Sequence, residues 1–141
     1  MRPDRQAYWN SEYASYWLQR IAEADRDASG TSQLVESDSK TVDLEGLHTM
    51  LDIVPLKAGQ RVLDVACGFG RAFPYFLGHG VEIVGTDLSD AMLNMAPPSL
   101  KGDERVSIVQ AEAENMPFVD GSFDAVVVIA AFDAFEQHLA L

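Results

Sequence analysis

RVLDVACGFGR, residues 61–71, is the stretch that decides the fold class. Its first five residues read as a buried strand, and Gly68 and Gly70 then indicate a tight turn that leads into a helix. Glycine allows positive φ and lets the backbone approach a ligand closely. In an open parallel α/β sheet, ligands bind beyond the carboxyl ends of the strands. The stretch therefore predicts a nucleotide-type binding site, with amides from about Arg71 onward facing an anion.

Asp64 and Phe73 bear on which ligand this turn accepts. Asp64 lies four residues before Gly68, where a carboxylate would repel a pyrophosphate. The dinucleotide fingerprint also requires a third glycine three residues after the second, and Phe73 occupies that position. An NAD-dependent oxidoreductase is therefore disfavoured. A ligand with an amino group and a carboxylate fits better, because Asp64 could accept the ammonium and the turn amides the carboxylate.

The segment DVACGFG, residues 64–70, resembles motif I of the class I S-adenosylmethionine-dependent methyltransferases, with Ala66 where the family usually has glycine. The methionine end of that cofactor carries both groups just described. A glycine turn of some other α/β domain is the alternative. The resemblance implies a cofactor site that includes Asp64, Ala66, Cys67, Gly68 and Gly70.

Composition restricts the class of protein and its partners. The 141 residues suit one domain, and the formal net charge of −12 would repel phosphate backbones and anionic lipids. We therefore expect neither nucleic acid nor membrane surfaces as partners. The single cysteine, Cys67, excludes an internal disulfide, fits a reducing compartment, and is expected to be a small packing residue rather than a reactive thiol. Without a long apolar run or a signal-peptide pattern, the expected location is cytoplasmic.

The chain divides into three parts by pattern. Residues 1–28 form a helical cap with an aromatic stripe, which either packs on the domain or covers the ligand cleft. Residues 29–42 are a polar linker. Residues 43–141 are the cofactor-binding α/β core, which is incomplete by the family's standard of seven strands in the order 3-2-1-4-5-7-6.

Strands and helices alternate along the core, which predicts a three-layer Rossmann-like α/β fold with a parallel sheet. By the resemblance, the four strands present have the order 3-2-1-4. The expected strands are 61–65, 81–86, 105–110 and 123–129, and the expected helices are 43–54, 71–78, 89–96 (ended by Pro97 and Pro98) and 133–141.

Asp87 ends the second strand, 17 residues after Gly70. A carboxylate at this place can accept hydrogen bonds from both ribose hydroxyls of a nucleoside. The alternative is that Asp87 only caps the next helix, but Ser89 is better placed for capping. Asp87 and its neighbour Leu88 are therefore assigned to the cofactor site.

The segment AEAENMPFVDGSFDAVV, residues 111–127, is the second resemblance to this family. It implies that Glu112 accepts from the adenine amine and that the Ala113 backbone donates to a ring nitrogen. Met116 and Phe118 either wall the adenine pocket or pack in the core, and the sequence leaves both possibilities open.

Catalytic residues are not evident in the sequence. Methyl transfer from a sulfonium needs positioning more than acid–base groups. The residues 130–133, AAFD, argue against the methyltransferases that modify amino groups of bases. His48, His79 and His138 read as structural or exposed, and no group of residues has metal-ligand spacing.

The run AVVVIAA, residues 125–131, is typical of a strand buried on both faces. At the edge of an incomplete sheet it would be a pairing hazard, so we expect either a truncated enzyme or pairing between copies. The resemblance implies methyl transfer from S-adenosylmethionine to a small molecule, similar to the quinone and sterol methyltransferases. The alternative is a non-catalytic cofactor-binding module or partner subunit.

Overall fold

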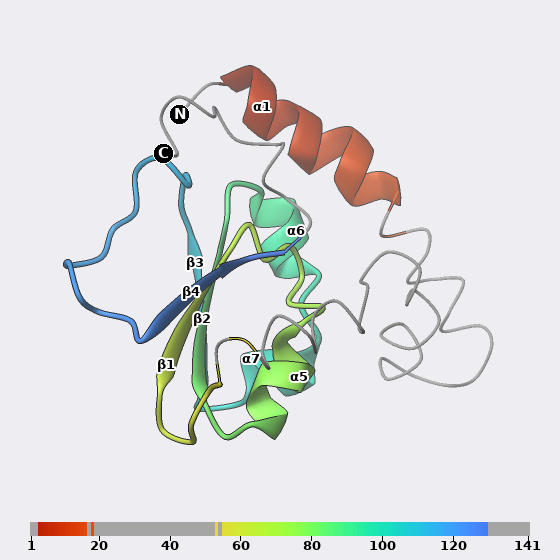
Figure 1. Ribbon diagram of the computed structural model, residues 1–141. Helices are drawn as coiled ribbons and strands as arrows, with labels where there is room; N and C mark the ends of the chain where they lie inside the picture. The colour runs from red at the N-terminus through yellow and green to blue at the C-terminus, as the bar shows by residue number, and fades with distance from the viewer. Residues whose placement is uncertain (1–2, 17, 19–52, 54, 130–141) are drawn as a thin grey trace.

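Four parallel strands form the centre of the protein in a computed structural model, which describes residues 3–16, 18, 53 and 55–129. Their order is β3-β2-β1-β4, as predicted (Figure 1). The strands are β1 (Arg61–Val65), β2 (Glu82–Asp87), β3 (Val106–Gln110) and β4 (Ala125–Val128). The linker 29–42, nearly all of the expected helix 43–54, the expected helix 133–141, His48 and His138 lie outside the described residues.

One face of the sheet carries the helices of the core (Figure 1). Helix α5 (Phe73–Gly78) presents Phe73 and Phe76, three residues apart, and both rings are fully buried against Val62 and Ile83. Val62 and Ile83 are partners in the parallel ladder of β1 and β2, so they lie side by side on this face. Burial of side chains of this size contributes about 1.5–3 kcal/mol each.

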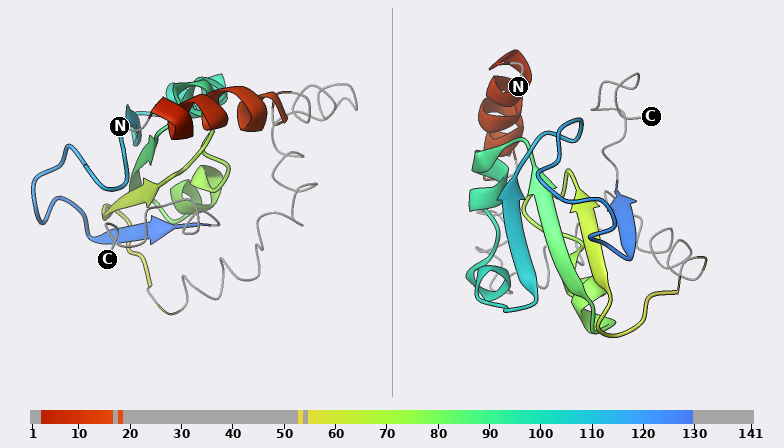
Figure 2. Two further views of the ribbon diagram at one scale, coloured as in Figure 1. Left: turned by 90° about the horizontal axis from the view of Figure 1, so that it is seen from above. Right: turned by 90° about the vertical axis from the view of Figure 1, so that its left-hand side faces the viewer.

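The opposite face is crossed by the segment 111–124, which Figure 2 shows running over the sheet between β3 and β4. Met116 and Phe118 pack against the buried cluster of β1 and β2 on this face, so the structure supports the core interpretation for both. Phe118 and Phe123 also meet edge to face at 5.0 Å between ring centroids. The cluster comprises Leu63, Val65 and Val84, with Val109, Ala113, Met116, Phe118, Phe123 and Val128 around it.

β4 joins the sheet through a parallel ladder with β1, from Val62 opposite Ala125 to Val65 opposite Val128, and Asp124 extends this link to Arg61. The Arg61 amide donates to Asp124 Oδ2 at 2.8 Å, and the Asp124 amide donates back to the Arg61 carbonyl at 2.8 Å. Among the described residues β4 pairs with β1 alone, as an edge strand. Val126 is 60% exposed, so β4 is not buried on both faces at that residue, and it has the exposed apolar character expected at the edge of an incomplete sheet.

The expected helix 89–96 is shorter, and a second helix that we did not expect follows it. Helix α6 (Asp90–Asn94) ends before the prolines, and α7 (Pro98–Lys101) begins with Pro98 in its first turn. Proline is favoured at that position because its fixed φ suits a helix start and its missing N–H needs no partner there. The proline pair therefore ends one helix and begins another.

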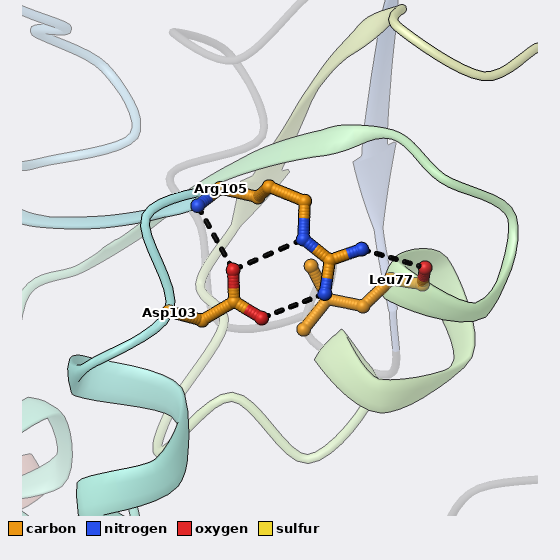
Figure 3. Close-up of polar contacts among 3 residues, drawn as sticks. All are labelled: Leu77, Asp103 and Arg105. Atoms are coloured by element: carbon orange, nitrogen blue, oxygen red, sulfur yellow. Dashed lines mark hydrogen bonds and ion pairs between the residues drawn. The ribbon is translucent and has the colours of Figure 1, made fainter.

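An ion pair closes the corner between α7 and β3 (Figure 3). Arg105 contacts Asp103 Oδ2 through Nη2 at 2.7 Å and donates from Nη1 to the Leu77 carbonyl at 3.2 Å. It thereby connects the start of β3 to the last turn of α5, at the amino edge of the sheet. Exposed pairs of this kind contribute little to stability.

The N-terminal segment is helical, as predicted, over its described part. It consists of α1 (Pro3–Tyr8), the π-helical turn η1 (Trp9–Tyr13) and a further helical stretch to residue 16. Figures 1 and 2 show it lying across α6. None of the helices in the described part of the chain has the length and apolar character needed to cross a membrane.

Candidate cofactor site

The turn after β1 has the backbone geometry expected of a ligand-binding loop. Gly68 and Gly70 have φ of +58° and +79°, which confirms the positive φ predicted for both. Ala66 also lies in the left-handed region, with φ of +59°. Ala66 stands where the family usually has glycine, and it occupies a conformation that costs an L-residue about 1–2 kcal/mol.

Asp64 lies under this turn, at the carboxyl end of β1. Its side chain is only 2% exposed, and among the described residues Oδ1 has no hydrogen-bond partner. Burial, followed by the negative charge of Asp87, raises the pKa of Asp64 to about 8, while the charge of Arg71 opposes this rise. A buried carboxyl group with an unused oxygen is suited to a cation that enters the site.

Asp87 lies at the end of β2, the strand next to β1, and its carboxylate is held in place by two backbone amides. The Gly68 amide donates to Oδ2 at 2.8 Å and the Ser89 amide to Oδ1 at 2.9 Å. Burial raises the pKa of Asp87, and the amides of Ser89, Gly68 and Leu88 oppose this. Each carboxylate oxygen can accept a second hydrogen bond, so Asp87 keeps its capacity to accept from hydroxyl groups.

Ser89 is the residue that caps α6. Its hydroxyl accepts from the Met92 amide at 3.1 Å, which is the usual bond of an N-cap serine. Asp87 is therefore not needed to cap the Met92 amide and remains available to bind a ligand. The sequence had likewise favoured Ser89 over Asp87 as the cap.

The amides of the glycine turn are directed differently from the expectation. The Cys67 amide donates to the Thr86 carbonyl at 2.9 Å, and the Gly68 amide donates to Asp87 Oδ2 at 2.8 Å. The Gly70 amide donates to the Cys67 carbonyl at 3.1 Å. These three amides thus bind protein oxygens. Arg71 is close enough to act on the charge of Asp64. The sequence predicted a role only for the Arg71 backbone amide, and nothing local in it indicated that the charge of the Arg71 side chain acts on Asp64.

Glu112 and Ala113 follow β3 at the same edge of the sheet. The Ala111 amide donates to the Asp87 carbonyl at 3.0 Å, and Gln110 Nε2 donates to the Leu88 carbonyl at 3.0 Å. The next residue, Glu112, forms an antiparallel bridge with Asn115. The structure therefore places all the predicted cofactor residues along the carboxyl ends of β1, β2 and β3.

Cys67 packs inside the turn. Its Sγ lies 3.5 Å from the Gly68 carbonyl, and a Cβ atom added to Gly85 would lie 2.7 Å from that sulfur. Burial, followed by the charges of Asp64 and Asp87, raises the pKa of the Cys67 thiol well above its ordinary value. A thiol that stays protonated is a poor nucleophile, which agrees with the packing role.

These features define a parallel α/β domain with a small-molecule site at the carboxyl edge of its strands. The profile of the family described as "Methyltransferase domain" matches residues 63–141, more than half of the chain. The protein belongs to this methyltransferase family.

Individual relatives agree with this assignment. A demethylmenaquinone methyltransferase of Clavibacter sepedonicus is 42% identical over 71 residues, which are 50% of this chain and 29% of that protein. The crystal structure of YcgJ from Bacillus subtilis is similar with a TM-score of 0.54 and 32% identity, covering 60% of this chain and 37% of that one.

A third similar protein is phosphoethanolamine N-methyltransferase 2 of Haemonchus contortus, solved with S-adenosylhomocysteine. Its TM-score is 0.53 at 32% identity, over 60% of this chain and 20% of that one. The chain spans about a third of the length of the curated relatives that it matches, from 29% to 38%.

Proposed function

We propose that this chain binds S-adenosylmethionine and transfers its methyl group to a small-molecule acceptor. The observation that carries the proposal is the pair of carboxyl groups on either side of the glycine turn: Asp64, which is buried, and Asp87, which is half-buried. Asp64 offers a buried oxygen without a partner among the described residues, which suits the ammonium of the cofactor. The nearby positive charge of Arg71 suits its carboxylate.

The other groups of the cofactor have matching sites along the same edge. Asp87, held by two amides, accepts hydrogen bonds from the ribose hydroxyls, with Leu88 beside it. Glu112 and the Ala113 backbone receive the adenine. The two residues before them are hydrogen-bonded to the end of β2, since Gln110 donates to the Leu88 carbonyl and the Ala111 amide to the Asp87 carbonyl. The bound cofactor supplies an electrophilic methyl group, and the protein holds it in line with the acceptor.

The acceptor is proposed to be a quinone-like small molecule. The demethylmenaquinone methyltransferase that is 42% identical over 71 residues supports this class. The net charge of −12 disfavours acceptors that are themselves polyanions, and it also supports the expected absence of nucleic-acid and membrane partners. A cytoplasmic location is part of the same proposal. For the exposed β4 edge we propose first that further strands of a longer protein cover it, and second that two copies pair through it.

The second candidate is a module that binds the cofactor without turnover. It is favoured by the site itself, because no described residue there is an evident catalytic group for an acceptor. Cofactor binding without methyl transfer to any quinone acceptor would identify such a module.

Calorimetric titration of the 141-residue chain with S-adenosylhomocysteine tests the site. We expect saturable binding that Asp87→Ala abolishes. Asp90→Ala, which removes an exposed carboxylate three residues away, is the matched control and is expected to bind normally. Equal binding by Asp87→Ala and the unaltered chain would contradict the proposal, and binding of NADH instead would revive the oxidoreductase.

A further inference from the structure

Asn10, in the N-terminal helix, contacts Ser89, which follows directly after the proposed cofactor residues Asp87 and Leu88. The Ser89 hydroxyl donates a hydrogen bond to Asn10 Oδ1 at 2.6 Å, across 79 positions of sequence. Ser89 is fully buried, and its hydroxyl already accepts from the Met92 amide. The hydroxyl thus donates to Asn10 and accepts from Met92, and together the two bonds determine where it lies.

Ser89 is in turn bonded to Asp87. The Ser89 amide donates to Asp87 Oδ1, while the Gly68 amide donates to Oδ2. A continuous series of hydrogen bonds thus runs from Asn10 through Ser89 to Asp87 and on to the glycine turn. No charged side chain takes part in it except Asp87 itself.

Apolar contacts hold the same helix on the same turn. Ala14, one helical turn after Asn10, is 2% exposed and packs with Phe69 and Met92. Phe69 lies between the two glycines of the turn, and Met92 lies in α6. The segment between Asn10 and Ala14 contains a π-helical turn, in which the Ala14 amide donates to the Trp9 carbonyl. π-Helical turns are rare in proteins, and those that occur are often found at functional sites.

We propose that Asn10 is a positioning residue for the cofactor site: through Ser89 it holds Asp87 in place and joins docking of the N-terminal helix to cofactor binding. This inference rests on the proposed cofactor function and adds to it. Because coupling between two events is reciprocal, a helix that stabilises the position of Asp87 is itself held more firmly when the cofactor is bound. The N-terminal helix then affects the affinity for the cofactor, and not only the binding of an acceptor.

Titration of the full 141-residue chain and its variants with S-adenosylhomocysteine tests the inference. Asn10→Ala removes the acceptor and is expected to raise the Kd about three- to tenfold, the effect of one lost hydrogen bond. Asn10→Asp keeps the acceptor oxygen and is expected to restore most of the affinity. Ser11→Ala is the control, because this exposed neighbour donates only to the Ala7 carbonyl of its own helix.

A second set of variants shows whether Asn10 acts through Ser89. In a Ser89→Ala background, neither Asn10→Ala nor Asn10→Asp is expected to change the Kd further. Equal loss in Asn10→Ala and Asn10→Asp, or an Asn10 effect that is the same in both backgrounds, would overturn the positioning role. Circular dichroism of each variant checks that the fold is kept.

Amide exchange of the free protein separates this inference from the proposed function. Asn10→Ala is expected to speed exchange of the Gly68 and Ser89 amides, which donate to Asp87. If the unaltered chain binds no S-adenosylhomocysteine, the proposed cofactor function fails, and faster exchange still supports the positioning of Asp87 by Asn10. If it binds the ligand and Asn10→Ala leaves both exchange and Kd unchanged, only the positioning role fails.

Discussion

The ring of Phe73 packs directly on Gly85: a Cβ atom at Gly85 would lie 2.3 Å from Phe73 Cζ. Gly85 is the ladder partner of Asp64, so the contact lies beneath the cofactor site. Phe73 occupies the position where a dinucleotide fold has its third glycine. Here the close approach of helix and sheet is made possible by a glycine on the neighbouring strand instead.

This contact predicts that Gly85→Ala destabilises the protein. The added methyl group overlaps both Phe73 and the Cys67 sulfur, and overpacking of this kind costs about 1–3 kcal/mol. A smaller side chain in Phe73→Leu is expected to relieve part of the cost, so that Gly85→Ala is milder in that background. Urea unfolding measures both effects.

Gly78→Ala is the matched control for that experiment. Gly78 ends α5, and no atom lies within 4 Å of an added Cβ there. The change should therefore be neutral or stabilising by up to about 1 kcal/mol. A Gly85→Ala variant as stable as Gly78→Ala would show that the helix does not pack closely on β2.

Ala66→Gly is expected to leave stability unchanged or to raise it by up to about 1 kcal/mol. Relief of the positive φ at Ala66 is offset in part by the greater freedom of glycine in the unfolded chain. Ala91→Gly, in α6, should instead cost about 1 kcal/mol, because glycine disfavours a helix interior. Thermal unfolding of both variants tests this, and equal losses would argue against a left-handed Ala66.

The buried carboxyl group of Asp64 predicts that stability falls as pH rises. Its pKa of about 8 in the folded protein lies above the ordinary value near 4, so the folded state keeps a proton that the unfolded state releases. Between about pH 4 and pH 8, this group lowers the free energy of unfolding by at most about 1.4 kcal/mol per pH unit. The loss levels off above the folded pKa.

Asp64→Asn is expected to remove that slope and to raise stability at pH 7, since it keeps the size of the side chain without its charge. Unfolding by urea at pH 5, 6, 7 and 8 measures the slope for each protein. Asp90→Asn, at an exposed position, is the control and should keep the slope of the unaltered chain. A slope that survives in Asp64→Asn would assign it to other groups.

Binding of S-adenosylhomocysteine is expected to release a proton from Asp64 and to tighten from pH 6 to pH 8. The ammonium favours the ionised carboxylate, whereas the empty site favours the protonated form because the group is buried next to Asp87. Calorimetry in two buffers with different heats of ionisation counts the protons released. Identical heats in both buffers would contradict this coupling.

The order of elements and the carboxyl-edge location of the site could be predicted from the sequence. The strand order that the family resemblance implied is confirmed. The strands and the glycine conformations are confirmed as well, because runs of branched apolar residues and glycines express short-range preferences. The start of α7 at Pro98 was not predicted, because a pair of prolines is typical of a helix end. The helix that follows depends on the packing of Leu100 in the core rather than on the prolines themselves.

The sequence by itself determined that residues 61–71 form a strand and a glycine turn, and that Asp64 and Asp87 end neighbouring strands. Only the tertiary structure decided what these residues meet. The Gly68 amide binds Asp87 across 19 positions, and Ser89 binds Asn10 across 79. Such contacts arise when separately formed segments dock, and packing, burial and direction of hydrogen bonds then select partners that no local pattern specifies.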